Sequence, residues 1–120
     1  MQKVDLSNKG AAYKFVYMLD TMEKLARASG DVLAVVDDRD TAKVLQQNII
    51  DEIDNYEHNV TGTMENSIKV RKMGDEYEVV GVDYTKFVNG RDRENEGEGF
   101  LDVAANQTML DTGEYVQLLV

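Results

Sequence analysis

The feature that most constrains this chain is a pair of alternating segments on either side of a Gly74-Asp75 turn. Apolar and charged residues alternate over residues 68–71 before the turn and over residues 76–79 after it, and further valines follow at 80 and 82. A two-residue turn in which glycine supplies the unusual backbone angle is typical of a β-hairpin. Because Val79 and Val80 are adjacent, they lie on opposite faces of the second strand. We therefore expect that strand to be covered on both sides.

Two segments before the hairpin carry apolar residues at helical spacing. In the first, Ser7 is a plausible N-cap, Ser29-Gly30 is the stop, and the apolar face consists of Ala12, Phe15, Val16, Leu19, Met22 and Ala26. The second has Asp37 or Asp40 as its N-cap, and its face consists of Ala42, Leu45, Ile49, Ile53 and Tyr56. The apolar run at 32–36 is too short for periodicity to separate helix from strand. We favour a further turn of the second helix.

The sequence after the hairpin predicts one helical turn over residues 84–90, ending at Gly90, and then a charged loop over residues 91–99. Phe100 begins another apolar helical face, which ends in a turn at 111–113. Residues 115–120 are β-prone and form either a further strand or an arm that pairs with a neighbouring molecule. The sequence thus predicts one α+β domain over residues 1–120. Its N-terminal helices pack on a small antiparallel sheet with a central hairpin and a further C-terminal helix.

The chain is strongly acidic, with 23 Asp and Glu against 13 Lys and Arg and a formal net charge of −10. Residues 7–28 are the exception, since they carry four basic and two acidic groups. An acidic surface disfavours binding to the phosphate backbone and suits a basic partner, a surface that repels nucleic acid, or simple solvation. The absence of cysteine excludes disulfides and zinc–thiolate sites. The sequence shows no secretory signal and no apolar run of membrane-spanning length, so we expect no membrane partner.

Several local patterns in the sequence could mark a metal, phosphate or catalytic site. Asp92, Glu94 and Glu96 are spaced like calcium ligands of an EF-hand and Gly97 occupies the sharp turn, but Val103 stands where the bidentate glutamate is required. His58 is the only histidine, and we interpret it as a helix-end residue stabilised by the helix dipole. The acids at 37–40 are typical of helix capping, and no glycine pattern matches a phosphate-binding loop. We therefore predict no catalytic residue, metal or cofactor, and no enzyme.

Three short motifs occur in a fixed order across the second half of the chain. The first contains Thr61, Gly62, Met64, Ser67 and Ile68; the second contains Tyr84, Phe87, Val88, Asn89 and Gly90; the third contains Phe100, Leu101 and Ala104. Together they resemble the small head–tail joining and tail-completion (neck) proteins of long-tailed bacteriophages. The chain departs from that pattern at Gly99, where the family has proline, and at residues 65–66, where basic residues are common. Its acidic C-terminal segment also replaces a long basic helix.

The resemblance implies a homo-oligomeric ring, sixfold or twelvefold, at the head–tail junction or tail end of a virion. Such a ring would be made in the host bacterial cytoplasm, would contact other phage neck or tail proteins, and would let DNA pass without binding it specifically. The resemblance further implies a turn set by Thr61 and Gly62, a sheet core at Ile68 and Val79, and an aromatic contact that joins loop and helix. This contact would consist of Tyr84, Phe87 and Phe100. The acids that could face the lumen are Asp92, Glu94, Glu96 and Glu98, with the 37–40 cluster as a second candidate, and residues 115–120 could join copies by strand addition.

A different class of function also fits the composition. A small acidic binding module or inhibitor, acting as a nucleic-acid mimic that masks a basic partner, would have the same surplus of carboxylates. A hydrolase or nuclease component is disfavoured because the sequence lacks clustered ligands. The oligomeric state and the genes beside this one separate the virion protein from the inhibitor.

Overall fold

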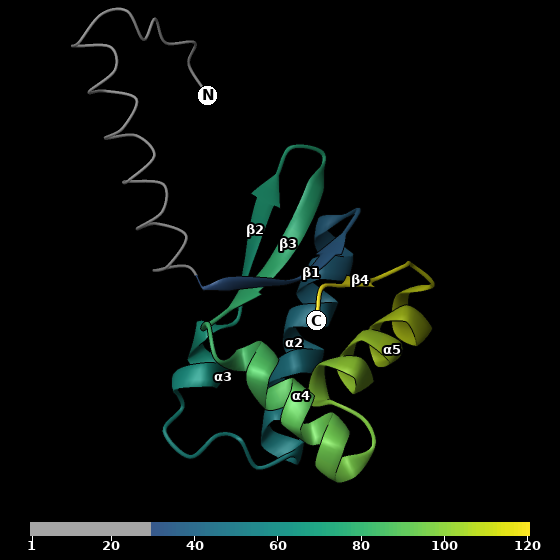
Figure 1. Cartoon of the computed structure of the whole chain (residues 1–120). Helices are drawn as coiled ribbons and strands as arrows, with labels where there is room; N and C mark the ends of the chain where they lie inside the picture. The colour runs from purple at the N-terminus through teal and green to yellow at the C-terminus, as the bar shows by residue number, and fades with distance from the viewer. Residues whose placement is uncertain (1–29) are drawn as a thin grey trace, which may run out of the picture.

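The computed structural model describes residues 30–120 as a four-stranded antiparallel sheet with helices packed against it (Figure 1). The elements are β1 (Asp31–Val36), α2 (Arg39–Asn55), α3 (Thr63–Ser67), β2 (Lys69–Met73), β3 (Glu76–Gly81), α4 (Thr85–Glu96), α5 (Phe100–Thr112) and β4 (Gln117–Leu118). The strands are ordered β2-β3-β1-β4. This arrangement confirms the predicted α+β class. The helix predicted over residues 7–28 lies outside the described residues.

Residues 31–36 form strand β1, so the favoured helical interpretation of this run is wrong. β1 lies between two antiparallel neighbours, with Ala34 opposite Val79 of β3 and Leu118 of β4. Branched valine side chains favour this extended conformation, and pairing on both edges satisfies its backbone polar groups. The five-residue apolar run at 32–36 shows neither period clearly, so only its sheet partners decide its conformation.

The predicted hairpin is confirmed. β2 and β3 pair with Val70 opposite Val79 and with Met73 opposite Glu76, on either side of Gly74 at φ +60°. Val79 and Val80 are both buried, which confirms that β3 is covered on both sides. Figure 1 shows the tip of this hairpin extending away from the helices.

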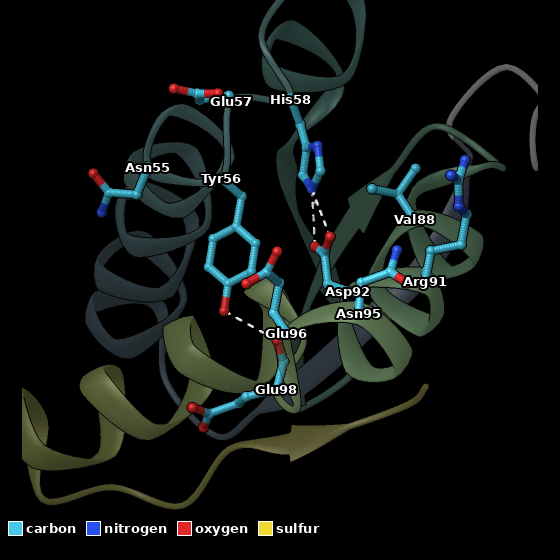
Figure 2. A pocket seen from close by; sticks show the side chains of 10 residues that line it. All are labelled: Asn55, Tyr56, Glu57, His58, Val88, Arg91, Asp92, Asn95, Glu96 and Glu98. Carbon is cyan, nitrogen blue, oxygen red and sulfur yellow. Dashed lines mark hydrogen bonds and ion pairs between the residues drawn. The ribbon is translucent and has the colours of Figure 1, made fainter.

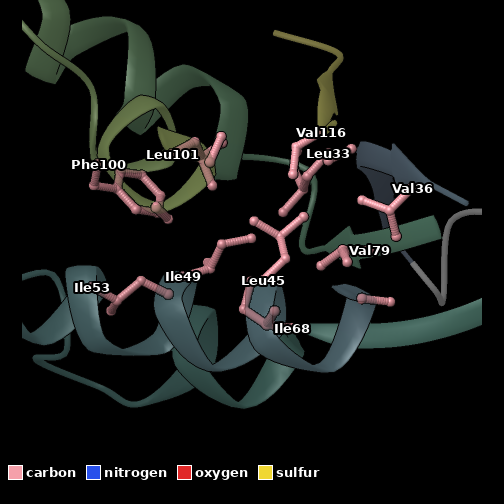
Figure 3. Close-up of a cluster of buried hydrophobic side chains, with 14 of the residues drawn as sticks. Leu33, Val36, Leu45, Ile49, Ile53, Ile68, Val79, Phe100, Leu101 and Val116 are labelled. Atoms are coloured by element: carbon pink, nitrogen blue, oxygen red, sulfur yellow. The ribbon is translucent and has the colours of Figure 1, made fainter. Parts of the chain in front are cut away.

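Helix α2 supplies much of the core. Its predicted apolar face is confirmed: Ala42, Leu45, Ile49 and Ile53 are fully buried, and Tyr56 is packed at the edge of the core. Figure 3 shows side chains of this face pointing toward those of α5 and β1.

The N-cap of α2 is Asp38, so the predicted caps at Asp37 and Asp40 are wrong. The Asp38 carboxylate accepts hydrogen bonds from the Thr41 N–H and the Thr41 hydroxyl, both at 2.8 Å. These bonds favour the ionised carboxylate and lower the pKa of Asp38, the backbone N–H having the larger effect.

Helix α4 replaces both the predicted single turn and the predicted charged loop. It runs through Gly90 to Glu96 and ends at Gly97, whose φ is +82°. Its buried face consists of Thr85, Asn89 and Asp92. Because these residues are polar, the buried positions of the helix carry no hydrophobic periodicity, and the prediction of a loop over 91–99 is wrong for this physical reason.

The C-terminal prediction is confirmed in its main features. Helix α5 begins at Phe100 as expected, and the predicted turn at 111–113 is the end of this helix, followed by Gly113 at φ +72°. Of the two alternatives for residues 115–120, the structure forms the strand: β4 pairs with β1 of the same chain, and Val116 is buried. No helix within residues 30–120 is long and apolar enough to cross a membrane.

Candidate functional site

The first of the three sequence motifs forms a compact turn. A hydrogen bond joins this turn to Val82, which lies just before the second motif. Gly62, at φ +73°, precedes the short helix α3, and Ile68 is buried behind it. The Ser67 hydroxyl donates to the Met64 carbonyl at 2.6 Å and accepts from the Val82 N–H at 2.9 Å. The chain is therefore held to the first motif two residues before Tyr84.

Thr61 lies just ahead of this turn. Its hydroxyl oxygen accepts a long hydrogen bond, 3.4 Å, from the Thr63 N–H at the start of α3. Thr61 and Gly62 thus occupy the turn that the resemblance implies.

The second and third motifs are joined by a buried hydrogen bond. Asn89 of α4 is fully buried, and its Oδ1 accepts from the Leu101 N–H at 2.8 Å. This N–H belongs to the first turn of α5, where backbone N–H groups have no acceptor within their own helix. A Cβ atom at Gly99 would lie 2.0 Å from Asn89 Oδ1, so only glycine permits this approach. Phe100 and Leu101 are both fully buried next to it.

A surface ion pair reinforces the same junction. Arg93 of α4 donates two hydrogen bonds to the Asp102 carboxylate of α5, at 2.6 and 2.7 Å. Asp102 also accepts from the Gly99 N–H at 3.0 Å. The hydrogen bond from Arg93 is the main reason that the pKa of Asp102 lies below its ordinary value.

Replacing Arg93 by methionine should lower the free energy of unfolding at pH 7 by about 1 kcal/mol, because the pair is bidentate but partly exposed. A carboxyl whose pKa is lowered by folding adds stability above its unfolded pKa, and this stability is lost as the pH falls through the lower folded pKa. The difference between the variant and the parent should therefore vanish in strong acid. Urea unfolding from pH 7 down to pH 2 measures it, with Arg91→Met as the control on the same helix. A difference that persists in acid would contradict this explanation.

The aromatic contact predicted among Tyr84, Phe87 and Phe100 is wrong. Tyr84 and Phe87 are exposed on α4, with 41% and 68% of their surfaces accessible, whereas Phe100 is fully buried. Phe100 packs instead on Tyr56 and His58, with ring centroids 6.3 and 5.5 Å away. A single turn over residues 84–90 would bring these aromatics together. In the longer helix α4, Phe87 instead lies on the exposed side.

A polar pocket of about 720 Å³ lies between the end of α2 and α4 (Figure 2). Residues 55–58 form one wall, and Val88, Arg91, Asp92 and Asn95 of α4 form the other, with Glu96 and Glu98 at one end. Three of these carboxylates, at 57, 96 and 98, belong to exposed residues. The pocket is therefore open and predominantly acidic.

His58 and Asp92 form a hydrogen-bonded pair across this pocket. Nε2 of His58 lies 2.9 and 3.0 Å from the two carboxylate oxygens of Asp92, which is 34 positions away in sequence. Asp92 is 7% exposed, so its predicted place among lumen-facing acids is wrong. The predicted dipole role of His58 misses this partner, and no local spacing in the sequence signals it. Glu94, Glu96 and Glu98 are exposed, as are Asp37 and Asp40.

Tyr56 completes the inner wall of the pocket. Its hydroxyl donates to the Glu98 carbonyl at 3.0 Å. Burial raises the pKa of this phenol, and the negative charges of Glu98 and Asp92 raise it further. The hydroxyl is thus held neutral and used as a structural donor.

Of the residues that line the pocket, none is a serine, threonine or cysteine that the His58–Asp92 pair could activate. Within residues 30–120 there is no group of three or more metal-ligating side chains. Comparisons of the chain with protein-family models, with curated proteins and with solved structures find no match in any of the three.

Proposed function

We propose that this chain is a structural protein of a tailed-bacteriophage virion. It acts as a head–tail connector or tail-completion component, and its copies form a ring through which the genome passes. The observation that carries this proposal is that hydrogen bonds link the segments that contain the three motifs behind the resemblance. Ser67 binds the strand end that precedes the second motif, and Asn89 of the second motif binds Leu101 of the third.

These bonds explain why the motifs occur together. The Ser67 hydroxyl of the first motif accepts from the Val82 N–H just before the second motif, and the side-chain carbonyl of Asn89 in the second accepts from the Leu101 N–H of the third, at a helix N-terminus. Three short patterns that coincide by chance would have no reason to be linked in this way. The three motifs therefore belong to one linked scaffold, which supports treating them as a single pattern in our proposal.

The charge of the molecule suits a channel for DNA. Residues 30–120 carry eight Lys and Arg against twenty Asp and Glu, a net charge of −12. Like charge repels the phosphate backbone and keeps a passing genome from adhering to the wall. Glu94, Glu96 and Glu98 are exposed in and just after the last turn of α4, so they are our candidates for that wall.

Light scattering after size exclusion and electron microscopy of the purified chain test the proposal. We expect a closed ring, or a monomer that assembles only when portal or tail-tube proteins are added. A protein that stays monomeric in their presence and tightly binds a DNA-processing enzyme would overturn the virion assignment. That result would instead support the acidic inhibitor, which the net charge of −12 in residues 30–120 also favours.

Charge reversal tests which acids line the ring. The triple change Glu94→Lys, Glu96→Lys and Glu98→Lys should raise the affinity of the ring for double-stranded DNA about tenfold or more at low salt, because each lysine can neutralise a phosphate. The charge-matched control changes Asp75, Glu76 and Glu114 to lysine. Fluorescence anisotropy with a labelled duplex measures both. Equal gains in the two variants would show that the acids at 94–98 do not face the lumen.

A further inference from the structure

One stripe along α4 is unusually apolar for an exposed surface. Tyr84, Phe87, Val88 and Arg91 are spaced so that they fall on one side of the helix, and we call these four residues the α4 face. Phe87 is 68% exposed and Tyr84 is 41% exposed. The face continues into the acidic pocket, since Val88 and Arg91 also line it (Figure 2). These two exposed aromatics, next to a pocket, make the α4 face a candidate docking surface.

The chain that precedes β1 enters the described structure beside this face. A Cβ atom at Gly30 would lie 1.8 Å from the carbonyl oxygen of Gly81, so the two backbones are in contact. Gly81 is only three residues before Tyr84. Figure 1 shows the start of β1 next to the start of α4. Gly30, the first described residue, therefore lies close to the start of the α4 face.

The composition of that preceding segment complements the surface. Residues 1–29 carry five basic and three acidic groups, against the net charge of −12 in residues 30–120. The basic residues at 9, 14, 24 and 27 largely flank the predicted apolar stripe rather than interrupt it. Such a segment offers apolar side chains for exposed aromatics and cations for a rim of carboxylates.

We propose that residues 9–27 dock on the α4 face of the same chain. With the rise per residue of an α-helix, the predicted apolar stripe from Ala12 to Ala26 would be about 21 Å long. The stretch from Tyr84, the N-cap of α4, to Glu96 is about 18 Å long. Docking with Ala26 near Tyr84 brings Lys14 to the end of α4 that carries the acids of residues 94–98. The short connection through Gly30 makes docking within one chain an intramolecular event with a high effective concentration. The proposal holds for a monomer or a ring, so it does not rest on the proposed function.

Limited trypsin digestion gives a first test, because docking protects the cleavage sites after Lys14, Lys24 and Arg27. Phe87→Ser should raise the rate of cleavage in this segment about tenfold, since it removes the main apolar contact from the face. Leu110→Ser is the matched control, as Leu110 of α5 is also exposed, at 80%. Equal rates for the parent and both variants would overturn the proposal.

A spin label separates docking in the same chain from docking on another copy. The protein has no cysteine, so Met22→Cys introduces a single attachment point for a nitroxide. In a ¹⁵N-labelled chain carrying the nitroxide, signals from the α4 face should broaden, while those from the hairpin tip at 73–75 should not. In a mixture of ¹⁵N chains without the nitroxide and unlabelled chains that carry it, the same signals should stay sharp. Broadening in the mixture, or none in either sample, would overturn docking within the chain.

Discussion

Replacing Gly99 by alanine should lower the free energy of unfolding by about 3 kcal/mol, although the change adds one methyl group. The backbone at Gly99, with φ −78°, is open to any residue, so the cost is entirely steric. The new Cβ would lie 2.0 Å from Asn89 Oδ1 and 2.6 Å from Asp102 Oδ2. Asn89 is fully buried and cannot move aside without breaking its bond to the Leu101 N–H.

A second glycine in the same region provides the matched control. Gly90 lies inside α4, and a Cβ atom there would meet nothing within 4 Å. Gly90→Ala should therefore stabilise the protein by about 0.5–1 kcal/mol, because alanine favours the helix more than glycine does. Urea unfolding followed by circular dichroism measures both variants. The two changes should have opposite signs.

The outcome also tests the secondary structure of α4. If residues 84–90 were a single turn ending at Gly90, as the sequence suggests, a glycine at that end would be needed for a left-handed conformation and Gly90→Ala would destabilise. A destabilised Gly90→Ala variant would contradict the three-turn helix. An unchanged Gly99→Ala variant would contradict the close contact between α4 and the start of α5.

The parts of the fold that the sequence predicts are those in which apolar side chains face the core at a regular spacing. The α2 face from Ala42 to Ile53, the Gly74 hairpin and the start of α5 at Phe100 all carry that signal, and each is confirmed. The sequence misassigns α4 because the residues that it buries are Thr85, Asn89 and Asp92. A helix whose buried residues are polar looks like a loop when only hydrophobic periodicity is considered.

The candidate site was less predictable for a related reason. His58 and Asp92 are brought together only when the end of α2 packs beside α4, and neither residue has a local neighbour that suggests its partner. Asp92 also lies within an acidic run whose other members are exposed. The sequence therefore gives no sign that this one aspartate is buried. Tertiary packing decides which acid of such a run turns inward, and the run itself contains no such information.

Replacing Asp92 by alanine should destabilise the protein by about 2–3 kcal/mol, because the loss removes a charge-assisted bond and leaves His58 without its partner. Glu94→Ala, two residues later on the exposed side of the same helix, is the control and should change stability by less than about 0.5 kcal/mol. Urea unfolding at pH 6 measures both. Equal effects would mean that Asp92 is as solvated as its neighbours.

A double-mutant cycle then isolates the contact itself. His58→Ala also removes packing against Phe100, whose ring centroid lies 5.5 Å away, so the single change overstates the contribution of the His58–Asp92 contact to stability. Comparing both single variants with the double variant cancels that packing term and should leave a coupling of about 1–2 kcal/mol. His58 with Glu94 should show no coupling. Because the pair joins the end of α2 to the middle of α4, its coupling energy measures how firmly the two walls of the acidic pocket are held together. A coupling near zero would mean that these walls are positioned by the core around Phe100 alone.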